Sequence, residues 1–168
     1  GRPGRYPGVL GARVADQEWF RQGLATHNGT EFAVADIACN PLLDGRMVAT
    51  YATAIRRGGL VDGEVLGVLG IFFDWEPQSR AVVQEVRLDP AEKDFTRCLL
   101  IDARRRVIAS SDGRGILTET FPLQVGAEPM GHYVADDGRL VGFALTPGYE
   151  TYRGLGWYGV VVQDRERG

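Results

Sequence analysis

The chain has 168 residues, enough for one ordinary domain or two small packed subdomains; 44% of its residues are apolar and 24% are charged. These are the proportions of a folded globular protein, so a disordered chain is not expected. The formal net charge of −3 shows no basic excess of the kind that nucleic-acid-binding proteins carry. No stretch approaches the roughly 18 consecutive apolar residues of a membrane span. We therefore expect no nucleic-acid partner, and membrane attachment only through segments outside this chain.

The N-terminal part predicts a loop followed by a short helix. The opening GRPGRYPG is a turn-rich sequence without an initiator Met or a signal peptide, and we expect the chain to be a fragment. Asp16 then has the character of a helix N-cap for residues 17–26, where Trp19 and Phe20 belong to a one-sided apolar pattern. Asn28, which precedes a glycine, is expected to end the helix.

Three strands are predicted next, because β-branched and aromatic residues recur between turn sequences. They cover residues 31–38, 47–57 and 64–75, and the turns NPLLDG and GGLVDG separate them. The third, EVLGVLGIFFDW, is the most apolar segment of the chain. Its nearly continuous apolar pattern predicts a central strand that is covered on both faces. The three strands should form one antiparallel sheet with short turns.

The second half of the chain predicts a helix and five further strands. Residues 76–88 carry valines and a leucine at helical spacing, with a proline near the first turn. The predicted strands cover residues 97–103, 106–112, 131–138, 139–148 and 156–163. Residues 116–123 are weakly patterned and predict a short helix or coil. The whole pattern indicates an α+β fold of antiparallel sheets flanked by helices.

Three segments resemble the Cache superfamily of extracytoplasmic sensor domains, whose units are PAS-like. DQEWFRQGL is similar to the Arg-x-Trp-Tyr helix that closes over the ligand in double Cache domains. GEVLGVLGIFFDW is similar to the G-V-x-G-x-D final strand of a Cache unit. CLLIDARRRVIASSDGRG is similar to the hairpin that opens such a unit. These segments follow one another in the order of a double Cache domain.

The resemblance implies a domain organisation and a function. Residues 1–75 would be the C-terminal half of a first PAS-like Cache unit, residues 76–95 a linking helix, and residues 96–168 a second unit. The protein would be the ligand-binding sensor domain of a bacterial signal-transduction protein, such as a chemotaxis receptor or a sensor kinase. It would bind a small molecule in the extracytoplasmic space. A cytoplasmic PAS- or GAF-like regulatory or dimerisation domain is the alternative.

The resemblance also implies where the ligand would bind. In double Cache domains the ligand lies between the sheet and the helix that carries the Trp, so Trp19 and Phe20 are candidate ligand contacts; packing of the helix on the sheet is the alternative. Gln17 stands where the family has an Arg, and Phe20 where it has a Tyr. Gln cannot form the charged bidentate pair that Arg forms with a carboxylate, which argues against a standard amino-acid sensor.

Four strand residues complete the predicted ligand site. Asp36 interrupts an apolar strand and could pair with a ligand amine, or could lie on a solvated face. Tyr51 and Thr53 share one face of the second strand and could present hydroxyls to a pocket, or could lie on a half-buried sheet face. Asp74 ends the most apolar strand, where it could bind an amine or cap the following helix.

No motif indicates catalysis, a metal or a cofactor. His27 and His132 have no partner at metal-ligand or nucleophile spacing, and Cys39 and Cys98 form no C-x-x-C pair. A non-enzymatic protein is therefore expected, with a small enzyme as the weaker alternative. An aromatic group near the C-terminus could pack the last strand or form the face of a homodimer. It consists of Tyr149, Tyr152, Trp157 and Tyr158.

Overall fold

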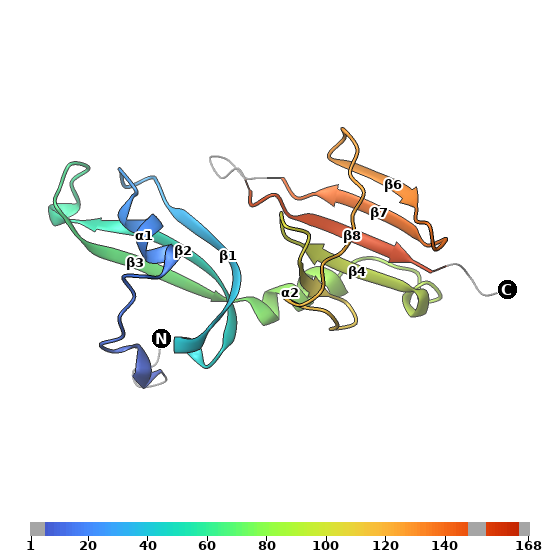
Figure 1. Ribbon diagram of the computed structural model, residues 1–168, viewed down its shortest axis with the longest axis horizontal. Coiled ribbons are helices and arrows are strands. Elements are labelled where there is room, and N and C mark those ends of the chain that lie inside the picture. The colour runs from blue at the N-terminus through green and yellow to red at the C-terminus, as the bar shows by residue number, and fades with distance from the viewer. Residues whose placement is uncertain (1–5, 148–153, 165–168) are drawn as a thin grey trace. The chain divides into compact units, whose positions relative to one another are not determined.

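The computed structural model describes residues 6–147 and 154–164 (Figure 1). The chain divides into two compact units, Gly1–Glu76 and Pro77–Gly168. Each unit contains its own antiparallel sheet, which agrees with the α+β fold expected from the sequence. Tyr149 and Tyr152 of the predicted aromatic group lie outside the described residues. In the part of the chain that the structure describes, no helix is long and apolar enough to cross a membrane.

Unit 1 is built on the predicted three-stranded antiparallel sheet. Its strands are β1 (Ala33–Asn40), β2 (Arg46–Arg56) and β3 (Val65–Asp74), in the order β1-β2-β3. Short 3₁₀ turns connect them at Pro41–Leu43 and Arg57–Gly59. The first turn is stabilised by Asn40, whose side-chain oxygen accepts a hydrogen bond from the backbone N–H of Leu42. A further 3₁₀ turn, Pro7–Val9, precedes the sheet.

The helix α1 (Glu18–Leu24) packs on one face of this sheet. Gly23 permits the close approach, because a Cβ at that position would lie 2.5 Å from Cγ1 of Val68 and 3.0 Å from Cβ of Ala52. Side chains of β2 and β3 alternate between the two faces of the sheet. Among the described residues of unit 1, no helix lies on the other face (Figure 1).

Both predicted ends of α1 were wrong. The N-cap is Gln17, whose side chain makes no capping bond, and Asp16 lies one residue earlier, in a turn that the N–H of Gln17 closes on the carbonyl of Val14. The helix ends at Ala25 rather than at Asn28. The side-chain oxygen of Asn28 instead accepts hydrogen bonds from two later backbone N–H groups and stabilises the turn that leads into β1.

The prediction that β3 is a central strand was also wrong. β2 is the central strand, and β3 lies at an edge of the sheet. Leu69, Ile71 and Phe73 are 49%, 48% and 46% exposed, so one face of this apolar strand is open. A continuous apolar run does not by itself distinguish a strand covered on both faces from an edge strand with one uncovered apolar face.

Unit 2 contains a five-stranded antiparallel sheet in the order β5-β4-β8-β7-β6. Its strands are β4 (Thr96–Ile101), β5 (Val107–Ser110), β6 (Met130–Val134), β7 (Leu140–Leu145) and β8 (Tyr158–Gln163), all at predicted positions. The helix α2 (Trp75–Gln84) precedes it and is shorter than the predicted linking helix. A 3₁₀ turn at Lys93–Phe95 leads into β4. Residues 116–123 are turn and coil, as one of the two alternatives predicted.

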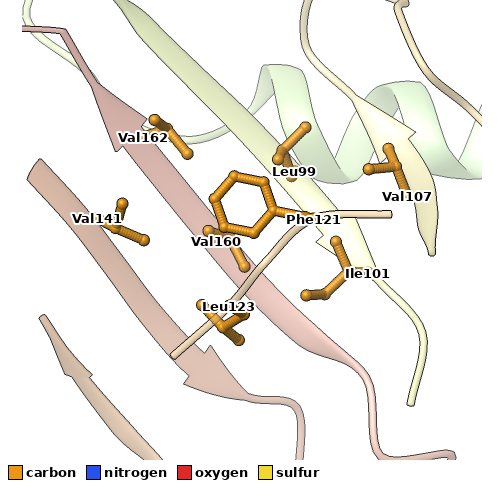
Figure 2. Packing of buried hydrophobic residues seen from close by; sticks show 8 residues of the cluster. All are labelled: Leu99, Ile101, Val107, Phe121, Leu123, Val141, Val160 and Val162. Carbon is orange, nitrogen blue, oxygen red and sulfur yellow. The ribbon is translucent and has the colours of Figure 1, made fainter. Parts of the chain in front are cut away.

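The core of unit 2 lies on one face of this sheet (Figure 2). Phe121 and Leu123, from the irregular segment between β5 and β6, pack onto valines, leucine and isoleucine of four strands. Tyr158 lies at the edge of this core, 6.2 Å from the ring of Phe143, with the guanidinium of Arg105 4.7 Å above its own ring. Tyr158 is therefore involved in packing within unit 2.

Candidate functional site

Aromatic side chains gather on the helix-covered face of the unit 1 sheet. Trp19 of α1 lies edge-on to Phe72 of β3, with ring centroids 5.2 Å apart, and edge-on to Phe20, with centroids 5.6 Å apart. Gly70 makes room for the indole, because a Cβ there would lie only 2.8 Å from Cζ3 of Trp19. All three aromatic residues are only partly buried. A small molecule can therefore reach this aromatic cluster only at its margin, unless α1 moves.

Phe72 is a residue of this face that the sequence analysis did not single out. When the motif G-V-x-G-x-D is laid on the chain from Gly67, its acidic position falls on Phe72. Counting the motif residue by residue would have shown this, and would have placed Asp74 two residues beyond it. An aromatic ring thus stands where a carboxylate was expected, and it contacts the Trp of the helix.

Asp74 lies on the same face, two residues after Phe72, which is about 7 Å further along the strand. Its Oδ2 is 2.6 Å from Nη1 of Arg46 on the neighbouring strand. Its Oδ1 is buried, and no described residue donates a hydrogen bond to it. Among the described residues Asp74 bonds to Arg46 and does not cap α2. A buried carboxylate oxygen without a donor is an unused acceptor next to the aromatic cluster.

Asp36 lies at an irregularity of β1. The pairing of β1 with β2 shifts register between Ala35 and Ala38, and Oδ1 of Asp36 accepts a hydrogen bond from the backbone N–H of Ile37. The side chain is half-buried. This hydrogen bond to Ile37 lies within the bulge, where an extra residue interrupts the ladder of backbone hydrogen bonds.

Tyr51 and Thr53 share a face of β2, as predicted, but it is the face opposite α1. They border a shallow, almost wholly apolar groove of about 320 Å³ on the open side of the sheet. The ring of Tyr51 lies 5.4 Å from that of Phe73, and the hydroxyl of Thr53 donates to the backbone carbonyl of Glu31. The structure therefore groups Trp19, Phe20 and Asp74 on one face of the sheet and Tyr51 and Thr53 on the other.

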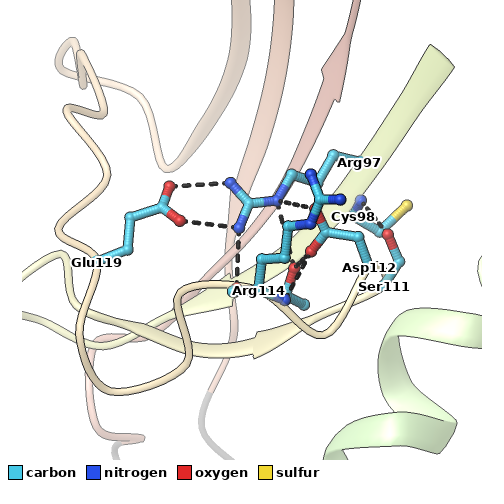
Figure 3. Close-up of polar contacts among 7 residues, drawn as sticks. Arg97, Cys98, Ser111, Asp112, Arg114 and Glu119 are labelled. Atoms are coloured by element: carbon cyan, nitrogen blue, oxygen red, sulfur yellow. Dashed lines mark hydrogen bonds and ion pairs between the residues drawn. The ribbon is translucent and has the colours of Figure 1, made fainter.

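Unit 2 contains a cavity of about 670 Å³, bordered by the end of α2, residues 93–98 and residues 111–114. Arg97 of β4 is one of the polar residues that line this cavity, and Figure 3 shows its polar contacts. Its two terminal nitrogens donate to the two carboxylate oxygens of Glu119 at 2.9 and 2.8 Å, and its Nε lies 3.1 Å from Oδ2 of Asp112. Two carboxylates therefore neutralise the charge of Arg97, so this guanidinium has no excess charge to offer an anion.

The electrostatics of this cluster follow from the same contacts. The hydrogen bonds from Arg97 hold the pKa of Glu119 below its usual value, against the opposing effect of partial burial. Cys98, the next residue of β4, is buried, and burial raises the pKa of its thiol. A thiol of raised pKa is a poor nucleophile at neutral pH. Within the described ranges no group of His, Cys, Asp and Glu side chains is arranged to hold a metal ion.

No protein-family model matches the chain, and no curated protein matches it. Solved structures do match. The ligand-binding domain of the Pseudomonas aeruginosa amino-acid chemoreceptor PctC, in complex with GABA, is 16% identical with a TM-score of 0.65; the match covers 92% of this chain and 63% of that one. The corresponding domain of the Pseudomonas fluorescens chemoreceptor CtaA, in complex with L-alanine, is 14% identical with a TM-score of 0.59 and coverages of 94% and 64%.

The chain has the fold of a chemoreceptor ligand-binding domain. The sensory domain of the Campylobacter jejuni chemoreceptor Tlp3 shares it too, at 15% identity and a TM-score of 0.53. The resemblance to Cache-type sensor domains is thus confirmed for the fold. This chain spans less than two thirds of the length of these three solved domains.

Proposed function

We propose that the chain is the small-molecule-binding part of a bacterial signal-transduction receptor, a chemoreceptor or a sensor kinase, and that it has no catalytic activity. The observation that supports this most directly is the fold, which is that of domains solved in complex with GABA and L-alanine. The receptor would bind its ligand in the extracytoplasmic space and attach to the membrane through segments outside residues 1–168. A homodimer is part of the same proposal.

The proposed ligand position is between α1 and the sheet of unit 1. Trp19 and Phe20 would contact the apolar body of the ligand, and the unused Oδ1 of Asp74 would accept a hydrogen bond from its amine. Gln17 offers no positive charge at the N-terminus of α1, so a ligand carboxylate is not favoured there. An amine with an apolar or aromatic body fits this face best.

The sequence also predicted that Asp36, Tyr51 and Thr53 contact the ligand. We propose that they contribute less to binding than Trp19, Phe20 and Asp74. Asp36 bonds within its bulge, and the other two lie on the opposite face of the sheet. Unit 1 is proposed to be the C-terminal half of a first PAS-like unit and unit 2 a whole one. Unit 1 would have two arrangements that differ in the position of α1. A ligand that binds one of them better would increase the population of that arrangement.

Thermal unfolding in the presence of amines, amino acids, carboxylates and purines tests the proposal. A ligand at about 100 times its Kd stabilises the folded state by roughly 2.7 kcal/mol, which raises Tm by several degrees. An amine should produce this shift, whereas a simple carboxylate should not. If no compound of the panel raises Tm, small-molecule sensing by this chain is wrong.

Two variants test the position of the ligand. Asp74→Asn keeps the volume of the side chain and removes its charge, so the Kd for an amine should rise at least about tenfold, a change of about 1.4 kcal/mol. Trp19→Ala should also weaken binding while the chain stays folded. Asp137→Asn, in an exposed turn of unit 2, is the matched control and should leave Kd unchanged. If all three folded variants have the same Kd, the ligand does not bind on this face of the sheet.

A further inference from the structure

The C-terminal end of α1 is joined to the sheet of unit 1 by one buried threonine. Thr26 follows the helix by two residues and is only 7% exposed. Its hydroxyl donates to the carbonyl of Gly23, in the last turn of the helix, at 2.8 Å, and accepts from the backbone N–H of Ala54 at 2.9 Å. One side chain thus bonds the end of the helix directly to β2, away from water, where a broken hydrogen bond is not replaced.

Arg56, the last residue of β2, holds the same threonine a second time. Its Nη2 donates to the backbone carbonyl of Thr26 at 2.7 Å, and its Nη1 donates to the carbonyl of Gly63, in the connection between β2 and β3, at 3.0 Å. The planar fork of the guanidinium fixes the distance between these two carbonyls. All the bonded groups lie between residues 23 and 63, so this anchor is complete within unit 1.

The N-terminal end of α1 is held in a different way. The side chain of Gln17 makes no capping bond, and Trp19 meets Phe72 edge to face, with ring centroids 5.2 Å apart. Among residues 6–147 and 154–164, no hydrogen bond joins the first turn of α1 to the sheet. Many weak contacts between rings can be exchanged gradually as the rings slide, whereas a hydrogen bond weakens steeply when its angle changes.

We propose that α1 moves by tilting about Thr26, so that the space between the helix and the sheet opens at the N-terminal end of the helix. The inference rests on the proposed function for the purpose of the movement. Trp19 lies about 10 Å from Thr26 along the helix axis, at roughly 1.5 Å per residue, so it moves much further than the last turn. Moving α1 away from the sheet as one body would instead break the bonds of Thr26 and leave buried donors unpaired.

Tilting about Thr26 sets the route by which the ligand enters. The opening lies beside Trp19 and at the end of the sheet where Asp74 follows Phe72, whereas the end of the helix at Thr26 stays closed. Arg56 is a positioning residue in this movement. It does not touch the ligand, but it keeps the pivot in place and connects it to the turn between β2 and β3.

Phe72→Leu in the ligand-free chain tests the direction of the movement. Leu removes the ring against which Trp19 packs, so the helix should tilt more often. Fluorine NMR of 5-fluorotryptophan-labelled protein with a soluble relaxation agent should show the exposure of the Trp19 indole rising at least about twofold. Exchange of the Ala54 amide, which is bonded to Thr26, should change less than about twofold in the same protein. Equal factors for the two reporters would mean that α1 moves as one body and would overturn the proposal.

Arg56→Gln tests the pivot itself. Without the guanidinium fork, exchange of the Ala54 amide should become at least about tenfold faster, relative to amides in the middle of β2 that report global unfolding. Arg57→Gln is the matched control, because the neighbouring Arg57 forms only an exposed ion pair with Glu64 and should leave the Ala54 amide unchanged. A folded Arg56→Gln chain whose Ala54 amide exchanges as slowly as in the unmodified chain would exclude the anchor and overturn the proposal.

Both measurements are made without a ligand, so they test the pivot separately from the proposed function. If no compound raises Tm while Phe72→Leu exposes only the indole of Trp19, the proposed function is wrong and the pivot is supported. If a compound raises Tm but the Ala54 amide opens together with the indole, binding is supported and the pivot is wrong.

Discussion

At the scale of single residues, Gly70 decides how closely α1 approaches the sheet of unit 1. Its missing side chain leaves the space that the indole of Trp19 fills, and Phe72 on the same face completes the contact. Gly23 plays the same part on the helix, against Val68 and Ala52. The helix–sheet contact thus depends on two glycines, one on each element, and on aromatic rings that meet edge to face.

Gly70→Ala should destabilise unit 1 by about 1–3 kcal/mol, because the new methyl group would overlap the indole and α1 would have to shift. Urea denaturation followed by circular dichroism measures the change. Gly67→Ala in the same strand is the control, since a Cβ at Gly67 has no atom within 4 Å; it should leave the free energy of unfolding nearly unchanged. Equal effects of the two substitutions would contradict the close contact at Gly70.

Glu119 should make the stability of unit 2 depend on pH. Its pKa is lowered in the folded state by the hydrogen bonds from Arg97, so its contribution is fully present above the pKa of the unfolded chain, about 4.3. That contribution is lost as the pH falls further, through the folded-state pKa. Urea denaturation between neutral and acidic pH should therefore show a loss of stability below about pH 4.3 that Glu119→Gln reduces. A variant with the same acid sensitivity as the unmodified chain would exclude this pair as its source.

At the scale of elements, the β4–β5 hairpin depends on one buried carboxylate. Asp102 is 0% exposed, and its side chain accepts hydrogen bonds from the backbone N–H groups of Arg104 and Arg106 and from Nε of Arg106. The turn also places Arg105 at a φ of 67°, a conformation that few residues other than glycine adopt. Asp102 therefore offsets the strain of this turn.

Asp102→Ala should lower the free energy of unfolding by about 2–4 kcal/mol, because it leaves buried donors and the Arg106 guanidinium without their acceptor. Asp137→Ala removes a similar bond to Arg139 in the turn between β6 and β7, but there both side chains are well exposed. Asp137→Ala should therefore change the free energy of unfolding, measured by chemical denaturation, very little. Similar losses for the two variants would be inconsistent with a special role for burial at Asp102.

The strands also show which features of the fold could be predicted from the sequence and which could not. All eight strands of the structure lie where alternating and β-branched residues predicted them, because these patterns are local. The place of β3 in its sheet was missed, since it depends on which strands are present to cover its edge. The pair of Arg97 and Glu119, which lie 22 residues apart, leaves no local pattern. In the candidate site Trp19 was found through a motif, whereas Phe72 was missed because the motif was not counted position by position.

At the scale of the whole molecule, the chain consists of two units, and the hydrophobic cluster around Phe121 and Leu123 belongs to unit 2. Phe121 and Leu123 take the space against the sheet of unit 2 (Figure 2). Unit 1 has a thinner cover, a seven-residue helix on one face and an open groove on the other. Under the proposed function, unit 1 would bind the ligand and unit 2 would have a structural part.

Phe121→Ala should destabilise unit 2 by about 3–5 kcal/mol through the cavity it leaves. Hydrogen exchange read out along the chain should show faster opening of β4, β7 and β8, with little change in β1 and β2. Faster exchange of equal size in both sheets would mean that the two units unfold as one and would contradict separate cores.

The indole of Trp19 gives the protein a built-in optical reporter. Its ring rests against Phe72 and over Gly70, so any ligand that lifts α1 transfers it from aromatic packing into water, and its fluorescence emission moves to longer wavelength. The other two tryptophans, Trp75, which is only 8% exposed, and Trp157, add a background signal. Binding of the proposed ligand could thus be followed without a dye or a label, at protein concentrations low enough to measure tight binding directly.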